Sequence, residues 1–148
     1  MLPMNSCRIF IVAHAPLASA LKACAEHVFA DAAADVQALD VLPEHDSAFW
    51  QVQADALLLA PRPGFAAADA AQPPAPVLLL TDIIGATPYN VACALAAHAA
   101  QAGLPACVLT GANLPMLLRA ITYRHESLPD LAERASSGAV QSITCIQP

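Results

Sequence analysis

Four short apolar runs, each followed by polar residues and then by a helical pattern, organise the chain. They cover residues 8–13, 36–42, 77–81 and 105–110. The first contains Ile9-Phe10-Ile11-Val12 without alternation, which is typical of a strand buried on both faces. We therefore expect four strands alternating with helices, that is, an α/β fold with a mainly parallel sheet and helices on both faces.

The helices are predicted over residues 16–30, from 43 to about 57, over 88–102, from 111 to about 121, and over 128–137. Pro16 and Pro88 suit first helical turns, Thr87 suits an N-cap, and Gly103 and Gly138 suit helix ends. Two apolar faces are predicted by spacing. They are Leu17, Leu21, Cys24 and Val28 in the first helix, and Phe49, Val52 and Leu57 in the second.

Two further segments stand apart from this alternation. Residues 61–76 are rich in proline and alanine and favour a loop. Residues 139–146 alternate, which predicts a last strand at an edge of the sheet or paired with another subunit. With 148 residues and no internal repeat, we expect one domain over residues 1–148.

Composition narrows the class of protein. The chain is 57% hydrophobic and 12% charged, which excludes disorder, and no segment approaches the roughly 20 apolar residues of a spanning helix. The N-terminus does not read as a signal peptide, so a cytoplasmic location is expected. A net charge of −6 with six Lys and Arg argues against nucleic acid as a partner. The five scattered cysteines predict small buried residues in a reducing compartment, with no metal site.

Candidate chemistry lies where two strands end. His14 closes the first strand and Asp82 follows the third, and the carboxyl ends of parallel strands meet at one edge of a sheet. Three helices are predicted to begin there, and a helix N-terminus attracts an anion. A carboxylate beside an imidazole fixes its tautomer, and Thr87 adds a hydroxyl for a phosphoryl oxygen. This set predicts transient phosphorylation of His14 without metal, nucleotide or other cofactor.

Simpler interpretations stay open at this point. A single histidine at a strand end is more often structural than catalytic, and Asp82 suits the cap of a loop equally well. Thr87 is an N-cap before it is a ligand. Gly85-Ala86 is neither a dinucleotide-binding fingerprint nor a P-loop.

Three segments carry a resemblance to a known family. They are residues 9–14, ending at His14, residues 78–90, reading LLLTDIIGATPYN, and residues 109–117, reading LTGANLPML. Family members look like D-x-x-G-G-[ST]-P-x-N and G-x-N-[LIV]-P-M-L in the last two. The chain thus resembles the IIA component of the mannose-type branch of the bacterial phosphoenolpyruvate:sugar phosphotransferase system.

The resemblance implies a four-stranded sheet in the order 2-1-3-4, with a fifth strand near residues 139–146 exchanged in a homodimer. It also implies that His14 accepts a phosphoryl group from the phosphocarrier protein HPr and passes it to a IIB component, with Asp82 beside it. Thr87, Gly85 and Ala86 would contact the phosphoryl group. Two departures stand out, because Ala15-Pro16 follows the histidine and Ala86 replaces a glycine, and both reduce backbone freedom.

Alternative functions remain at this stage. The chain is expected to be a phosphotransferase that feeds a sugar permease or serves regulation. A second possibility is the phosphotransfer domain of a dihydroxyacetone kinase system, whose acceptor differs. A third is a non-catalytic binding module that keeps the fold and has lost the reaction.

Overall fold

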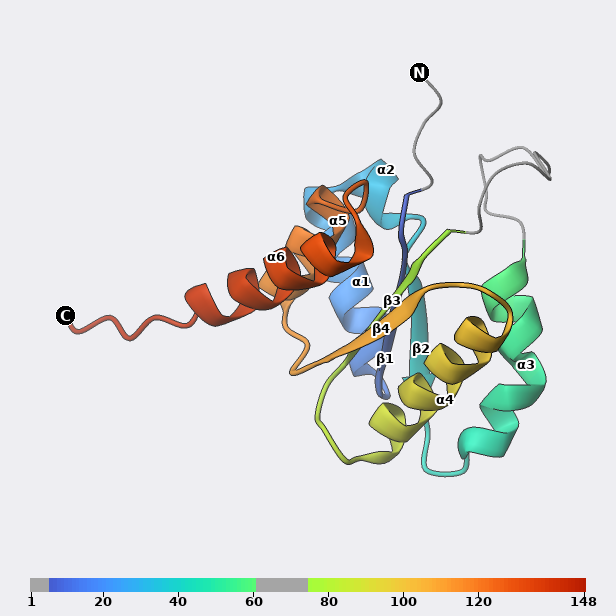
Figure 1. The fold of residues 1–148 in the computed structure, drawn as a ribbon. Coiled ribbons are helices and arrows are strands. Elements are labelled where there is room, and N and C mark those ends of the chain that lie inside the picture. The colour runs from blue at the N-terminus through green and yellow to red at the C-terminus, as the bar shows by residue number, and fades with distance from the viewer. Residues whose placement is uncertain (1–5, 61–74) are drawn as a thin grey trace, which may run out of the picture.

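The strands of the computed structural model, which describes residues 6–60 and 75–148, form one parallel sheet. They are β1 (Arg8–His14), β2 (Gln37–Val41), β3 (Val77–Thr81) and β4 (Ala106–Thr110), in the order β2-β1-β3-β4 (Figure 1). The predicted sheet and the order implied by the resemblance are confirmed. All four carboxyl ends therefore lie at the same edge, which is the edge from which the helices that follow the strands begin.

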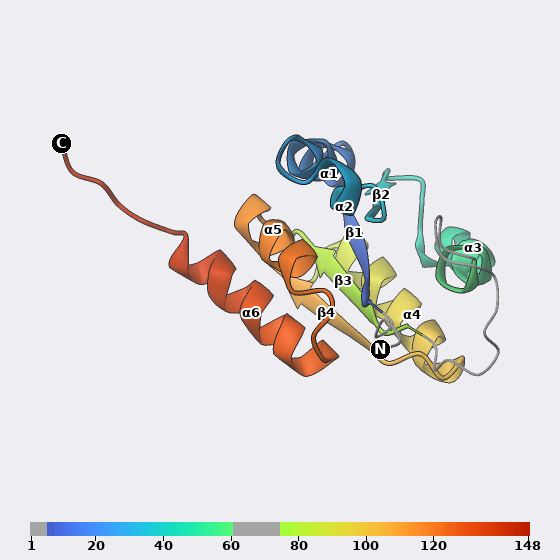
Figure 2. The ribbon, with the colours of Figure 1, turned by 90° about the horizontal axis from the view of Figure 1, so that it is seen from above.

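Helices cover both faces of this sheet (Figure 2). One face carries α1 (Leu17–Val28), α2 (Ala30–Ala33), α5 (Leu114–Thr122) and α6 (Leu128–Gln141). The other carries α3 (Ser47–Leu59) and α4 (Thr87–Gln101). Because side chains alternate along a strand, Ile9 and Ile11 pack into the first layer and Phe10 and Val12 into the second.

The apolar strand β1 begins with a charged residue, Arg8, whose hydrogen bonds account for its position there. The residue is only 9% exposed, and its guanidinium donates hydrogen bonds to the carbonyl oxygens of Leu57, at 2.8 Å, and Leu58. Those carbonyls belong to the last turn of α3, where no intrahelical donor is left for them. Arg8 thus joins the amino end of β1 to the carboxyl end of α3.

The predicted inner faces of the first two long helices are wrong. In α1 the buried residues are Ala18 and Ala25, with Leu21 packed against them, whereas Leu17, Cys24 and Val28 are exposed. Small side chains let this helix lie close to the sheet. The larger apolar residues were assigned to the core by their spacing, and the alanines beside them occupy it instead.

The same error occurs in α3. Trp50, Ala54 and Leu58 are buried, whereas Phe49 is exposed and Val52 is 86% exposed; of the predicted face only Leu57 packs partly against the core. This helix begins at Ser47, because Asp46 caps it through Phe49 N at 2.9 Å, and residues 43–46 precede it. Because apolar residues lie on both sides of α3, their spacing does not indicate which face of the helix is buried.

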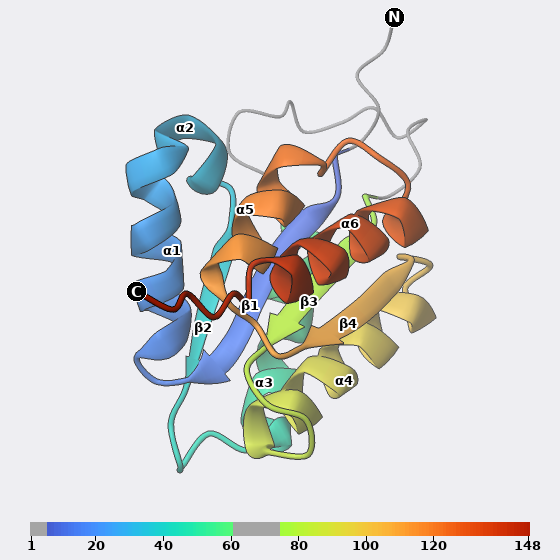
Figure 3. The ribbon, with the colours of Figure 1, turned by 90° about the vertical axis from the view of Figure 1, so that its left-hand side faces the viewer.

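The C-terminal region differs most from the prediction. Helix α6 continues through Gly138 to Gln141, and residues 143–148 form no strand. They extend away from the rest of the chain in Figures 1 and 2, and toward the viewer in Figure 3. A Cβ at Gly138 would lie 2.5 Å from Cγ of Arg119 in α5. The glycine therefore permits close helix–helix contact and does not end the helix.

The cysteines are buried only in part. Cys7 is buried, but Cys24 and Cys145 are exposed, so the expectation of buried cysteines fails for these two.

Most of the loop predicted at 61–76 lies outside the described residues. Within the described ranges, no helix has the length and apolarity to span a membrane. In those same ranges no group of three or more acidic, histidine or cysteine side chains is placed to hold a metal ion.

Candidate functional site

The structure brings His14 and Asp82 together. His14 is the last residue of β1 and Asp82 directly follows β3, its neighbour in the sheet. Oδ2 of Asp82 lies 2.6 Å from Nδ1 of His14 and accepts a hydrogen bond from the His14 backbone amide at 2.9 Å. The carboxylate therefore fixes both the backbone and the ring of the histidine.

This arrangement leaves the other ring nitrogen available. With Nδ1–H held by the carboxylate, Nε2 carries the lone pair of a neutral imidazole. The His14 side chain is 56% exposed, whereas that of Asp82 is 12% exposed. Among the described residues, no hydrogen-bond partner occupies Nε2. His14 can thus present a nucleophilic nitrogen to a reactant that arrives from outside.

The hydrogen bonds also set the charge of Asp82. Burial by itself raises the pKa of this carboxyl group, but the amide and ring of His14 and the amide of Ile83, at 2.9 Å from Oδ1, outweigh it. The net effect lowers the pKa of Asp82 below its ordinary value of 3.8. Asp82 is therefore an anion at neutral pH, which is the state that accepts the Nδ1 proton.

The loop from Asp82 to Ala86 leads into α4. Gly85 has φ +83°, a left-handed conformation that favours glycine, and Ala86 is extended. Ala86 is the N-cap of α4, and Thr87 is its first residue, so the prediction that Thr87 is the N-cap is wrong by one position. Thr87 is exposed at this start of α4, which leaves its hydroxyl accessible to a ligand.

Four helices, α1, α3, α4 and α5, begin at this edge. They differ in whether a side chain accepts a hydrogen bond from a backbone amide of their first turn. Asp46 caps α3, and Asn113 caps α5 through Met116 N at 2.9 Å. Asp40, from β2, accepts a hydrogen bond from Ser19 N in the first turn of α1 at 3.1 Å. In the described part of the chain, α4 alone of these four receives no side-chain acceptor.

Sequence reasoning placed three helix N-termini here as equivalent anion sites. It missed the contact of Asp40 with Ser19, for which the signal was one acidic residue inside the otherwise apolar run 36–42. Since α1 and α5 already have acceptors, the free amides and positive end of α4 are the part of this edge best suited to an anion.

The other histidines take no part in the contact between His14 and Asp82. His27 and His125 are exposed, but His98 is half-buried with Nε2 2.6 Å from Asp55 Oδ1. His45 is also half-buried and stacks on Phe49 with ring centroids 4.0 Å apart. The His98–Asp55 pair joins the middle of α3 to the end of α4 and lies away from the strand ends.

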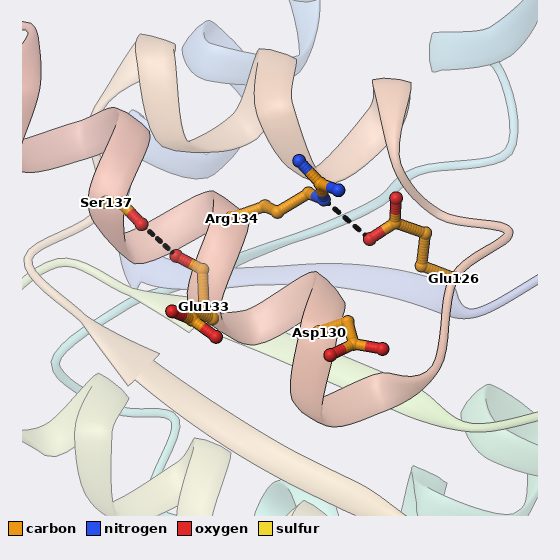
Figure 4. Close-up of a pocket in the computed structure, with 5 residues that line it drawn as sticks. All are labelled: Glu126, Asp130, Glu133, Arg134 and Ser137. Atoms are coloured by element: carbon orange, nitrogen blue, oxygen red, sulfur yellow. Dashed lines mark hydrogen bonds and ion pairs between the residues drawn. The ribbon is translucent and has the colours of Figure 1, made fainter.

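A separate hollow of about 510 Å³ lies along α6 (Figure 4). It is lined by Glu126, Asp130, Glu133, Arg134 and Ser137. Nε of Arg134 pairs with Glu126 at 2.7 Å, and Ser127 bonds to Asp130 at 2.6 Å. These contacts explain Glu126 and Arg134 by surface pairing and Asp130 by helix capping.

Comparisons with known proteins find similarity in part of the sequence and in the fold. The family model described as "PTS system fructose IIA component" matches residues 65–136. That range contains Asp82 and Thr87, but His14 lies outside it. No curated protein matches the chain.

Several solved structures are similar over nearly the whole chain. The phosphotransferase system component EIIA from Streptococcus agalactiae is 25% identical, with a TM-score of 0.72 over 93% of this chain and 95% of that chain. The mannose/sorbose-specific IIA subunit from Enterococcus faecalis is 22% identical, with a TM-score of 0.75 over 97% and 96% of the two chains.

A sigma-54 interaction domain protein from Enterococcus faecalis shares the fold at 14% identity, with a TM-score of 0.69 over 93% of each chain. The fold thus occurs in proteins with different descriptions. The sequence match is confined to residues 65–136, whereas the similarity in fold extends over nearly the whole chain. The chain is thus similar to mannose-type IIA components of the phosphotransferase system, in sequence over residues 65–136 and in fold over nearly its whole length.

Proposed function

We propose that this protein is a phosphoryl carrier that accepts a phosphoryl group on His14 from phosphorylated HPr and passes it to a IIB component or a regulatory acceptor. The observation that carries the proposal is the 2.6 Å contact between Asp82 Oδ2 and His14 Nδ1 on a histidine that is otherwise exposed. This geometry supports Nε2 as the nucleophile.

In the proposed step, the lone pair of Nε2 attacks the phosphorus atom of the donor's phosphohistidine. The phosphorus–nitrogen bond on the donor breaks, and its electron pair returns to the donor imidazole. His14 then carries the phosphoryl group on Nε2 and positive charge on its ring, which the Asp82 carboxylate stabilises through Nδ1–H. Onward transfer repeats the same exchange with the next acceptor.

The phosphoryl oxygens need hydrogen-bond donors. The start of α4 supports this role, since its first turn has no side-chain acceptor and Thr87 adds a hydroxyl. Gly85 and Ala86 form the approach to that turn, with Gly85 supplying the left-handed residue. The alanine that replaces a family glycine at Ala86 adopts an ordinary extended backbone, which any residue tolerates.

The surface around His14 supports a protein as the reactant. Large apolar side chains remain exposed on the segments that follow β1 and β3, namely Leu17, Ile83 and Ile84. Exposed apolar groups of this kind suit a transient protein contact better than a small polar substrate. HPr as donor, a IIB component as acceptor, and a homodimer as the working unit are all parts of this proposal.

Intact-mass measurement tests the proposal directly. After incubation with phosphoenolpyruvate, enzyme I and HPr, the protein is expected to gain about 80 Da, and acid should remove the gain. His14→Ala should show no gain. His98→Ala is the matched control, since it removes the other histidine paired with an aspartate at 2.6 Å and should label normally.

Other results would redirect the assignment. Labelling that drains only to a kinase subunit with bound nucleotide would favour the dihydroxyacetone kinase system. If folded wild-type protein shows no gain, or if His14→Ala labels like the wild type, the proposed carrier function of His14 is wrong. The first of these two results would favour the non-catalytic binding module.

A further inference from the structure

We infer that Asp40 is a positioning residue which occupies the N-terminus of α1 and so leaves α4 as the helix end that holds the phosphoryl group; this inference rests on the proposed function. The sequence assigned Asp40 no role, and it lies on β2, away from both predicted site residues in the chain.

The contact itself is a helix cap supplied from a neighbouring strand. Helix α1 begins after Pro16, whose side chain offers no acceptor. Oδ1 of Asp40 accepts a hydrogen bond from the backbone amide of Ser19 at 3.1 Å, and Oδ2 accepts one from the Ser19 hydroxyl. Both carboxylate oxygens of Asp40 are therefore engaged by the first turn of α1.

This cap lies next to His14 through the sheet and through the chain. In the register of β1 with β2, Asp40 pairs with Ala13, and Val41 pairs with His14. The Ala15 amide donates a hydrogen bond to Val41 O at 3.1 Å. The short turn that joins His14 to α1 is thus held by β2 at both of its ends.

The electrostatic consequence follows from the helix dipole. An uncapped N-terminus carries about half a positive charge, and α1 begins three residues after His14. The Asp40 carboxylate offsets this charge. A phosphoryl group on His14 is then stabilised from the α4 side and not from both sides, which keeps it easier to pass on.

Two variants, one at each partner of this contact, separate the effect of charge from that of packing. Asp40→Asn keeps an oxygen that accepts from the Ser19 amide but removes the charge, and Ser19→Ala removes the hydroxyl contact but keeps the charge. We expect both to lower the melting temperature slightly. Only Asp40→Asn should shift the phosphotransfer equilibrium with HPr toward the phosphorylated protein, by about two- to fivefold, and less at high salt.

A merely structural role for Asp40 predicts a different result. If Asp40→Asn lowers the melting temperature and leaves the equilibrium where the wild type has it, the inference is wrong. Equal shifts in Ser19→Ala and Asp40→Asn would overturn it as well, because they would trace the effect to packing.

A second measurement does not depend on phosphotransfer. Titration of inorganic phosphate into Asp40→Ala, followed by amide NMR, should move the Ser19 and Ala18 amide signals, since the N-terminus of α1 is then open. The wild type should show no such movement. Equal movement in both proteins would overturn the inference even if His14 is phosphorylated, and a difference between them would stand even if the carrier function fails.

Discussion

One oxygen of Asp82, Oδ2, accepts hydrogen bonds from both the backbone amide and the ring nitrogen of His14, at 2.9 and 2.6 Å. The two residues are 68 positions apart in the chain and adjacent across two paired strands. The carboxylate therefore fixes where the histidine lies as well as which ring nitrogen carries the proton.

Replacement of Asp82 is expected to slow phosphorylation of His14 without abolishing it. In Asp82→Asn the amide no longer stabilises positive charge on the ring, but Nε2 remains in place. We expect a rate about 10- to 100-fold lower, the size of effect found when the residue that orients a functional histidine is removed. Rapid-quench labelling with phosphorylated HPr measures it, and a wild-type rate would remove Asp82 from the mechanism.

The lowered pKa of Asp82 predicts how stability depends on acidity. Because the folded-state pKa lies below the ordinary 3.8, the ionised carboxylate contributes stability at neutral pH, and this is lost as pH falls through the folded pKa. Chemical denaturation from roughly pH 5 to pH 2 should show a shallower decline for Asp82→Asn than for the wild type. Parallel curves would contradict this origin of the shift.

Thr87 offers a test of the proposed phosphoryl site. Thr87→Val keeps the shape of the side chain and removes the hydroxyl, so we expect phosphorylation to slow by about tenfold, the cost of one hydrogen bond to a charged group. Thr87→Ser restores the hydroxyl and should restore most of the rate. If Thr87→Val transfers normally, the hydroxyl makes no contact with the phosphoryl group.

Gly138 gives a prediction about packing alone. Alanine is the better helix former, yet Gly138→Ala should destabilise the protein by about 1–3 kcal/mol, because its Cβ would meet Cγ of Arg119 at 2.5 Å. Urea unfolding measures this, with phosphorylation of His14 unchanged. The same substitution in an Arg119→Ala background should cost less, and equal costs in both backgrounds would show that Arg119 is not the obstacle.

The extended C-terminal segment predicts a change of assembly state. Val140, Ile143 and Ile146 are exposed in the single chain, and β4 is an edge strand with no partner on one side among the described residues. If a homodimer forms by exchange of this segment, deletion of residues 142–148 should convert it to a monomer in light scattering. A dimer that survives the deletion would place its interface elsewhere.

Much of the fold could be predicted because its strands are continuous apolar runs. Such a run is typical of a strand buried on both faces of a parallel sheet. His14 and Asp82 are the polar residues at which two of these runs end. Their contact followed from the rule that parallel strands end at one edge. The proposed nucleophile and the carboxylate beside it could therefore be predicted from the sequence.

Helix faces and caps were harder, for physical reasons. In a chain rich in alanine, the residue that faces the sheet is chosen by close approach, as Ala18 and Ala25 show, and spacing of the larger residues misleads. The cap of α1 by Asp40 joins residues 21 positions apart, and local patterns of helix capping contain no such contact. Gly138 looked like a helix end because glycine serves both roles.

The division of the site between β1 and β3 has a consequence for folding. His14 and Asp82 meet only when β1 pairs with β3, which closes a loop of nearly half the chain. Such long-range contacts form late in folding and at high entropic cost. Residues 65–136 include Asp82 and the turn proposed to bind the phosphoryl group, but not His14, the proposed nucleophile. A nascent or truncated chain in which β1 is not paired with β3 would thus be unable to accept the phosphoryl group. Phosphotransfer activity would therefore show that the sheet has formed.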